Sequence, residues 1–184
     1  MVTHLRGATL RWPRPEPRTA IIMLSMSTKS VRDLLGKALA WHDAHASFED
    51  AVKDIPADLR GKRPEGLPYS VWELLEHLRI AQRDILDFSV DQNYKEDKKW
   101  PDDYWPPSPA PPSEAAWEES IREFIADRKA MEKLAADTSV DLEAKIPHGR
   151  GQTCLRELVL TIDHNAYHIG QLVLVRRLLG IWKK

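Results

Sequence analysis

Cysteine is almost absent from this sequence, which has only Cys154 among its 184 residues. A single thiol cannot form a disulfide within the chain, and it excludes a zinc knuckle built from several cysteines. We therefore expect a reducing compartment, the cytoplasm. Long hydrophobic runs are also missing, because charged residues interrupt every apolar segment before it reaches the roughly 20 residues of a membrane-spanning helix. The sequence thus predicts a protein without a membrane partner.

An excess of charge of either sign is missing too. The chain carries 27 basic and 28 acidic residues, so it has no broad cationic surface to attract the phosphate backbone of a nucleic acid. A nucleic acid is therefore not an expected partner. With 184 residues, 42% of them hydrophobic, the chain has the size and the apolar content of one domain around a continuous core.

The first residues differ in composition from the rest of the chain. Arginines alternate there with prolines and show no amphipathic period, which indicates disorder. A signal peptide is excluded because the apolar run Ala20 to Leu24 is too short and no small-residue cleavage site follows it. Met23 or Met26 could be the native start. We therefore interpret residues 1–25 as a disordered or misannotated extension and residues 26–184 as the folded domain.

Four segments show the periodicity of amphipathic helices. The first runs from Val31 to Val52, and the second opens at Ser70, whose hydroxyl can cap the free amides while Glu73 reaches back to the Ser70 amide. The third runs from Ser113 to about Ala136 and the fourth from Thr153 to about Leu179. No segment has a convincing strand pattern, so the sequence predicts an all-α fold, a four-helix bundle.

A long crossover separates the second predicted helix from the third. Residues 91–112 are too rich in proline for a helix or a central strand. Three large aromatic residues lie in this segment, Trp100, Tyr104 and Trp105, and leaving them in water would be costly. We expect the crossover to pack onto the bundle, either as a hydrophobic plug or as a lid over a pocket.

The fourth predicted helix is apolar on two sides. Leu172 and Val175 share one side with His164 and His168. The roughly opposite side holds a second apolar row: Leu155, Leu158, Ile162, Ile169 and Val173. One side can face the bundle. The other requires a further partner, which is either another helix of the same chain or a second subunit.

Three histidines form a candidate metal site. His164 and His168 are four residues apart, so their imidazoles project from one helix face and can chelate one ion. His77 lies at the edge of the apolar stripe of the second helix and could supply a third nitrogen. Such a set suits zinc, nickel, iron or copper and leaves coordination positions open. Spacing alone does not distinguish this pair from one that arises by chance. Asn165 follows His164, so the glutamate of an HExxH metalloprotease is missing.

The string Asp163-His-Asn-Ala-Tyr-His-Ile-Gly-Gln171, with Glu76-His-Leu on the second helix, resembles the DinB superfamily. The resemblance covers the chain from about Ser27 to its end. It implies an up-down-down-up bundle with a long crossover between helices two and three, assembled as a homodimer. It also implies that His77, His164 and His168 are ligands to zinc or nickel. Some members are thiol-dependent transferases or isomerases that use bacillithiol, mycothiol or glutathione.

Further titratable residues lie near this predicted site. His42, His45 and Glu49 share the apolar stripe of the first predicted helix. Either they line the metal pocket, with His45 as a general base, or they bond to one another at the end of the bundle. Other polar residues are candidates to orient the ligands or to serve the structure: Glu73, Asp84, Glu157, Gln171 and Cys154.

These observations lead to one hypothesis and two rivals. The first is a metal-dependent enzyme of the thiol-dependent transferase or hydrolase type that acts on a small molecule, with a low-molecular-weight thiol as a further partner. The second is a non-catalytic stress-related or interaction module whose metal only ties two helices together. The third is a small-molecule binder that kept the pocket and lost the metal. The sequence does not choose between them, because a fold does not fix a function.

Overall fold

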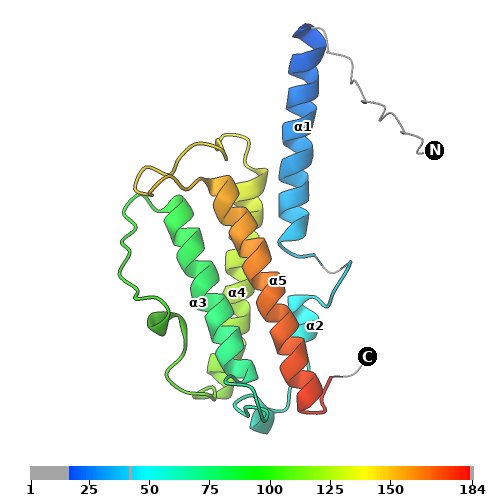
Figure 1. The fold of residues 1–184 in the computed structure, drawn as a ribbon, viewed down its shortest axis with the longest axis vertical. Helices are drawn as coiled ribbons and strands as arrows, with labels where there is room; N and C mark the ends of the chain where they lie inside the picture. Colours follow the sequence, from blue (N-terminus) through cyan, green and yellow to red (C-terminus); the bar gives the residue numbers. More distant parts are fainter. Residues whose placement is uncertain (1–16, 42, 183–184) are drawn as a thin grey trace, which may run out of the picture. The chain divides into compact units, whose positions relative to one another are not determined.

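The computed structural model describes residues 17–41 and 43–182, and for residues 17–27 only the backbone. The described chain is all-helical, with five α-helices (Figure 1): α1 Pro17–Ala38, α2 Phe48–Val52, α3 Val71–Val90, α4 Glu114–Ala136 and α5 Cys154–Leu178. This confirms the predicted all-α class. The chain divides into two units between Val31 and Arg32, and every side-chain contact described below lies in the second. Within the described residues, no helix combines the length and the hydrophobicity needed to cross a bilayer.

The three long helices α3, α4 and α5 begin where the sequence predicts, because each has a capping residue at its start. The Ser70 hydroxyl accepts a hydrogen bond from the Glu73 amide, and the Glu73 carboxylate accepts one from the Ser70 amide. Ser113 caps α4 and Thr153 caps α5 in the same way through their hydroxyl groups. Each cap satisfies an amide that has no partner within its own helix.

The prediction of one continuous helix from Val31 to Val52 is wrong. Helix α1 ends at Ala38, and α2 begins afresh at Phe48. The cause is a second capping box, in which the Ser47 hydroxyl accepts from the Asp50 amide and the Asp50 carboxylate accepts from the Ser47 amide. This local arrangement starts a new helix in spite of the apolar periodicity that runs through it.

The N-terminal boundary also differs from the expectation. Helix α1 begins at Pro17, inside the segment 1–25 for which the sequence indicates disorder. Proline suits the first turn of a helix, where its missing amide hydrogen has no helical acceptor to bond. The run that follows contains alanine, methionine and leucine, which favour helix. Residues 1–16 of the predicted extension lie outside the described residues.

Helices α3, α4 and α5 lie side by side (Figure 1). Along α3 and α4, Glu76 contacts Ser120 and the later residue Gln82 contacts Phe124, so these two helices run parallel. Helix α5 runs antiparallel to α3, because His77 near the start of α3 contacts His168, whereas Ser89 near its end contacts Cys154. The long crossover 91–112 makes the parallel pair possible.

The core consists of two apolar clusters with a polar layer between them. In that layer Gln82 donates to the carbonyl of Phe124 and accepts from the Asn165 amide nitrogen. Around the stacked rings of Phe48 and Phe124, one cluster joins α2, α3, α4 and α5. The other gathers around Met131 from α4 and includes residues of α1, α3 and α5. Leu158 is buried here and Ile162 packs against it, so both predicted apolar sides of α5 find partners within the chain.

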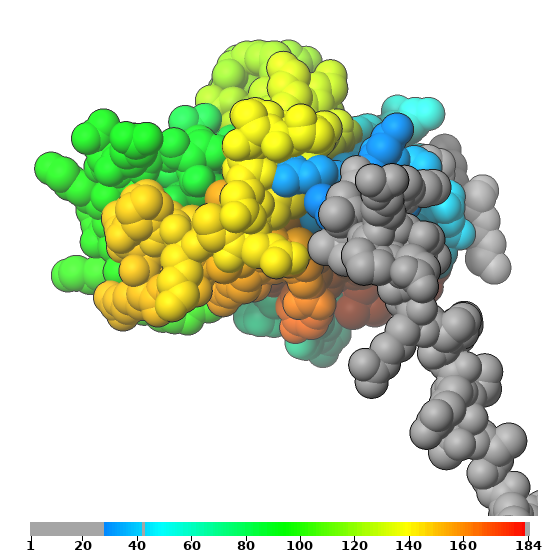
Figure 2. Space-filling view, turned by 90° about the horizontal axis from the view of Figure 1, so that it is seen from above, coloured from blue at the N-terminus to red at the C-terminus, as the bar shows by residue number. Residues whose placement is uncertain are grey.

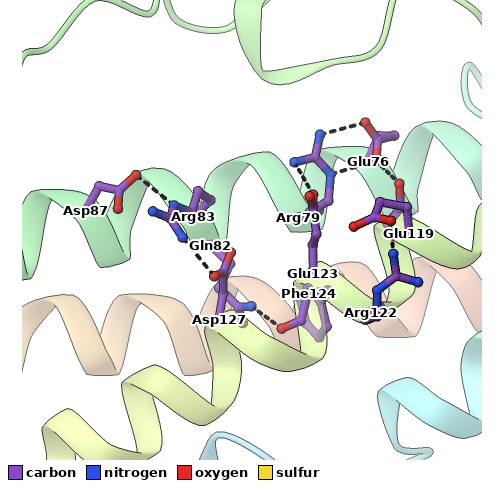
Figure 3. A network of polar contacts seen from close by, with 11 residues as sticks. Glu76, Arg79, Gln82, Arg83, Asp87, Glu119, Arg122, Glu123, Phe124 and Asp127 are labelled. Carbon is purple, nitrogen blue, oxygen red and sulfur yellow. Dashed lines mark hydrogen bonds and ion pairs between the residues drawn. The ribbon is translucent and has the colours of Figure 1, made fainter. Parts of the chain in front are cut away.

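Ion pairs between α3 and α4 fix how α3 is rotated (Figure 3). Arg79 bonds Glu76 on its own helix and Glu123 on α4, and Arg83 bonds Asp87 and Asp127 in the same manner. Although burial raises the pKa of Glu76, the hydrogen bonds from Arg79 and Ser120 outweigh it and lower that pKa. Because this polar strip faces α4, the neighbouring face of α3 is turned toward α5 and carries His77.

The crossover folds against α3 and against the turn before α5. Its short 3₁₀ helix, Asp102–Tyr104, brings the Tyr104 hydroxyl to Asp84 on α3 at 2.6 Å. Figure 2 shows the turn before α5 next to the crossover, where Arg150 pairs with Glu96 at 3.1 Å. The expectation that the crossover packs onto the bundle is therefore confirmed.

Candidate metal centre

Helices α3 and α5 bring three imidazoles together. His77 comes from α3, while His164 and His168 project one turn apart from α5. The Nε2 atom of His77 lies 3.1 Å from Nε2 of His168 and 3.1 Å from Nε2 of His164. One ligand atom from each of the three residues lies within 4.8 Å of the others, an arrangement that could hold a metal ion.

The nitrogen separations fit a shared cation. Imidazole nitrogens bind zinc at about 2.0–2.1 Å, so two of them on one ion are separated by about 2.9–3.4 Å at bond angles between octahedral and tetrahedral. The observed 3.1 Å falls inside that range. The donor set, three nitrogens from imidazole, is also one that zinc, nickel, iron and copper accept.

The protonation of the rings gives an independent argument for a cation. The Nδ1 atom of His77 bonds the Tyr104 carbonyl oxygen at 2.9 Å, and a carbonyl can only accept. The Nδ1 atom of His168 bonds the Gln171 side-chain oxygen at 2.6 Å. Both Nδ1 atoms therefore carry the hydrogen, which leaves lone pairs on the two Nε2 atoms that face each other. A positive ion between them removes this repulsion, and acceptors at Nδ1 are typical of metal-bound histidines.

Burial keeps the three rings in the neutral form that a metal requires. It lowers the pKa of His77, and it lowers the pKa of His164 and of His168 to about 4 in each case. The neighbouring imidazoles act in the same direction on the pKa values of His164 and His168, because two positive rings at this distance would repel. At neutral pH, all three residues are thus available as ligands.

Aromatic residues cover one side of the histidine cluster. The Trp105 ring stacks on the His77 ring, with centroids 4.0 Å apart and planes inclined by 5°. Trp105 also stacks with Tyr69 at 6.1 Å. Trp100, in contrast, is 71% exposed. Trp105 thus behaves as the predicted plug, whereas Trp100 does not.

The predicted catalytic residue His45 lies elsewhere. It is exposed, and its Nδ1 atom bonds the backbone oxygen of Ala46 at 2.9 Å. Glu49 pairs with Arg128 of α4, whose hydrogen bond lowers the pKa of the Glu49 carboxyl. His42 lies outside the described residues. The structure therefore brings neither His45 nor Glu49 to the cluster, because the helix that would have carried them there is broken, and the catalytic role of His45 stays a prediction.

Of the other polar residues proposed from the sequence, one orients a histidine of the cluster and the others have structural roles. Gln171 orients His168, as described above. Glu73 instead completes the cap of α3 and pairs with Arg63. Glu157 is buried and pairs with Arg156. Burial raises the pKa of the Cys154 thiol, which agrees with a structural role for this residue.

Sequence reasoning missed the two groups that the crossover contributes. The His77 ring is oriented by the backbone oxygen of Tyr104 and covered by Trp105. A backbone oxygen has no signature in a sequence. Trp105 did have one, because a large aromatic in a proline-rich segment must pack somewhere, but the pattern does not say where.

Replacing Tyr104 with phenylalanine is expected to weaken metal binding. The Tyr104 hydroxyl anchors the crossover to Asp84, and the Tyr104 carbonyl holds His77. We expect a loss of roughly tenfold, the lower end of the range for groups that orient a metal ligand. Tyr94→Phe is the matched control, because Tyr94 bonds the same carboxylate at 3.2 Å, and the histidine whose ring it stacks on is His148, which is not one of the three in the cluster. Chelator competition measures both affinities, and equal losses in the two variants would contradict the role of Tyr104.

Three comparisons with known proteins supplement this geometry. A family model described as the DinB superfamily matches residues 40–172, which include all three histidines. A search of curated proteins and a search of solved structures each returned no match.

Proposed function

The chain belongs to the DinB superfamily, and we propose that His77, His164 and His168 hold one divalent transition metal for chemistry on a small molecule. The metal in this proposal is zinc or nickel. The reaction is a thiol-dependent transfer or a hydrolysis. The observation that carries the proposal is the convergence of three Nε2 atoms, two of which face each other without a hydrogen between them.

The number of ligands favours an open site over a purely structural one. Among the described residues, the group that could hold the ion has three members. Structural zinc sites are closed by four protein ligands, whereas catalytic sites keep a position for water or substrate. A divalent ion in such a site lowers the pKa of a thiol or water molecule that binds in the open position.

The residues around the histidines would restrict what reaches that position. The Tyr104 carbonyl and the Gln171 side chain fix the orientation of His77 and His168. Trp105 excludes water from one face of His77. His164 borders a cavity of about 420 Å³, a volume suited to a small molecule. The cavity thus offers a route to the centre along the side of His164.

Thiol binding by the metal-loaded protein tests this function. Glutathione, bacillithiol and mycothiol are each added to the zinc and nickel forms, and the melting temperature is measured. At least one thiol is expected to raise it, because a ligand that binds only the folded state stabilises that state. The metal-free protein is the control. If no thiol stabilises either metal form while the metal itself does, the ion has a structural role and the transferase proposal fails.

The remaining parts of the proposal concern assembly and location. An up-down-down-up bundle is proposed, since the parallel α3 and α4 and the antiparallel α5 fit the last three of its four positions. A homodimer is supported by a strip of exposed apolar side chains on α5: Val159, Tyr167, Leu174 and Leu178. The cytoplasm is proposed because one buried cysteine needs no oxidising compartment.

A further inference from the structure

We infer that the cavity beside the metal centre binds the flat, uncharged hydrophobic part of a ligand whose other end reaches the metal. This inference rests on the proposed function and names the class of molecule that the site takes. The metal-binding end is a thiol or another donor atom. The other end is an aromatic ring or a group of similar shape.

The position of the cavity determines in which direction such a ligand would extend from the metal centre. The cavity lies between α3 and α5, on the side of His164 toward the start of α5. Asp84 and Phe88 on α3 border it, as do Glu157 and Leu160 on α5. The crossover and the turn before α5 form the remaining walls, which Figure 2 shows next to each other. Since His164 belongs to both the cavity and the histidine cluster, a bound molecule can contact both.

The walls are unusually rich in aromatic rings. Four aromatic side chains and two imidazoles border the cavity: Phe88, Tyr94, Trp100, Tyr104, His148 and His164. Trp100 is the largest of these and is 71% exposed, although exposure of so large an apolar surface is unfavourable. A flat group in the cavity would cover the Trp100 ring and gain the stacking that water cannot provide.

The charges in the walls argue for an uncharged ligand. Five charged side chains border the cavity, and each already has a partner of opposite sign. Asp84 pairs with Lys98 at 3.3 Å. Glu96 pairs with Arg150 at 3.1 Å, and Glu157 with Arg156 at 2.8 Å. Asp84 also accepts hydrogen bonds from Tyr94 and Tyr104. The described walls therefore leave no free charge to recognise an ionic group, and the apolar ring surfaces remain as the binding feature.

Two imidazoles of different size test this inference. Imidazole and 4-phenylimidazole carry the same metal-binding head, but only the second has a flat hydrophobic tail. Each is titrated into cobalt-loaded protein while the visible absorption of the cobalt is recorded. We expect 4-phenylimidazole to bind about tenfold or more tightly than imidazole, because the cavity buries its phenyl ring. Trp100→Ala should reduce this preference by about threefold or more.

A second exposed tryptophan provides the matched control. Trp41 is 46% exposed and does not border the cavity, so Trp41→Ala should keep the full preference. Equal affinities for the two imidazoles would overturn the inference, and so would a preference that Trp100→Ala leaves intact.

The experiment can contradict the inference about the cavity and the proposal of a metal centre independently of each other. If imidazole changes the spectrum but the phenyl group adds nothing, the open metal position stands and the cavity inference falls. If neither imidazole changes the spectrum, the open position is wrong. The binding heat of 4-phenylimidazole then decides the cavity: binding that Trp100→Ala weakens supports the inference, and the absence of binding overturns it.

Discussion

His168→Ala is expected to weaken metal binding by more than about 100-fold. Loss of a group that only orients a ligand already costs about 10- to 100-fold, and His168 would supply a ligand atom itself. Its Nε2 atom lies 3.1 Å from that of His77, so its removal would leave two donors in place of three. Metal content after dialysis and the affinity from chelator competition measure the effect. His77→Ala and His164→Ala should behave alike.

An exposed histidine shows whether such a loss is specific. His45 is exposed and bonds only a neighbouring backbone oxygen among the contacts described for it, so His45→Ala should bind metal like the unchanged protein. A His168→Ala variant that retains stoichiometric metal with unchanged affinity would contradict the proposed centre. Circular dichroism of each variant separates loss of a ligand from loss of the fold.

Arg176→Ala is expected to destabilise the fold by about 3 kcal/mol, because it leaves backbone oxygens without a charged donor. Arg176 is 5% exposed. Its Nη1 atom donates to the carbonyl oxygens of Asp50 at 2.6 Å and Ala51 at 3.0 Å, at the end of α2. Helix α2 has only five residues, too few to be stable alone. For a domain of this size, the expected fall in melting temperature is about 6–12 °C.

The adjacent residue is the control for this change. Arg177 lies next to Arg176 on α5 but is exposed, so Arg177→Ala should alter the free energy of unfolding by less than about 0.5 kcal/mol. Urea unfolding of the metal-free proteins measures both variants in the same state. Similar values for Arg176→Ala and Arg177→Ala would show that α2 does not depend on this contact.

Local signals in the sequence predicted most of the fold. Ser70, Ser113 and Thr153 start their helices through bonds that span three residues, and such bonds can be read from the sequence. The same kind of signal lies at Ser47 and Asp50, but the apolar periodicity that runs through it predicts one continuous helix, which the structure does not have. Periodicity reports a buried face, but it does not report whether the chain continues straight between two buried turns.

The candidate site was predictable only in part, because local patterns in the sequence do not report how separate segments pack together. His164 and His168 are neighbours through the geometry of one helix, which their spacing reveals. His77 joins them through the packing of α3 on α5, so the residues alone left it a possible ligand and the family resemblance made it an expected one. The Tyr104 carbonyl and the Trp105 ring reach His77 through an irregular crossover, whose path no periodic pattern encodes.

The crossover would link the binding of the proposed ion to the binding of the proposed ligand. Tyr104 contacts His77 through its backbone, while its ring borders the cavity and its hydroxyl bonds Asp84. A molecule that keeps Tyr104 in this position would therefore raise the affinity of the three histidines for the proposed ion. Because binding free energies are reciprocal, the ion would then raise the affinity of the cavity for that molecule by the same factor. One residue of an irregular segment can thus make occupancy of the cavity depend on the metal supply.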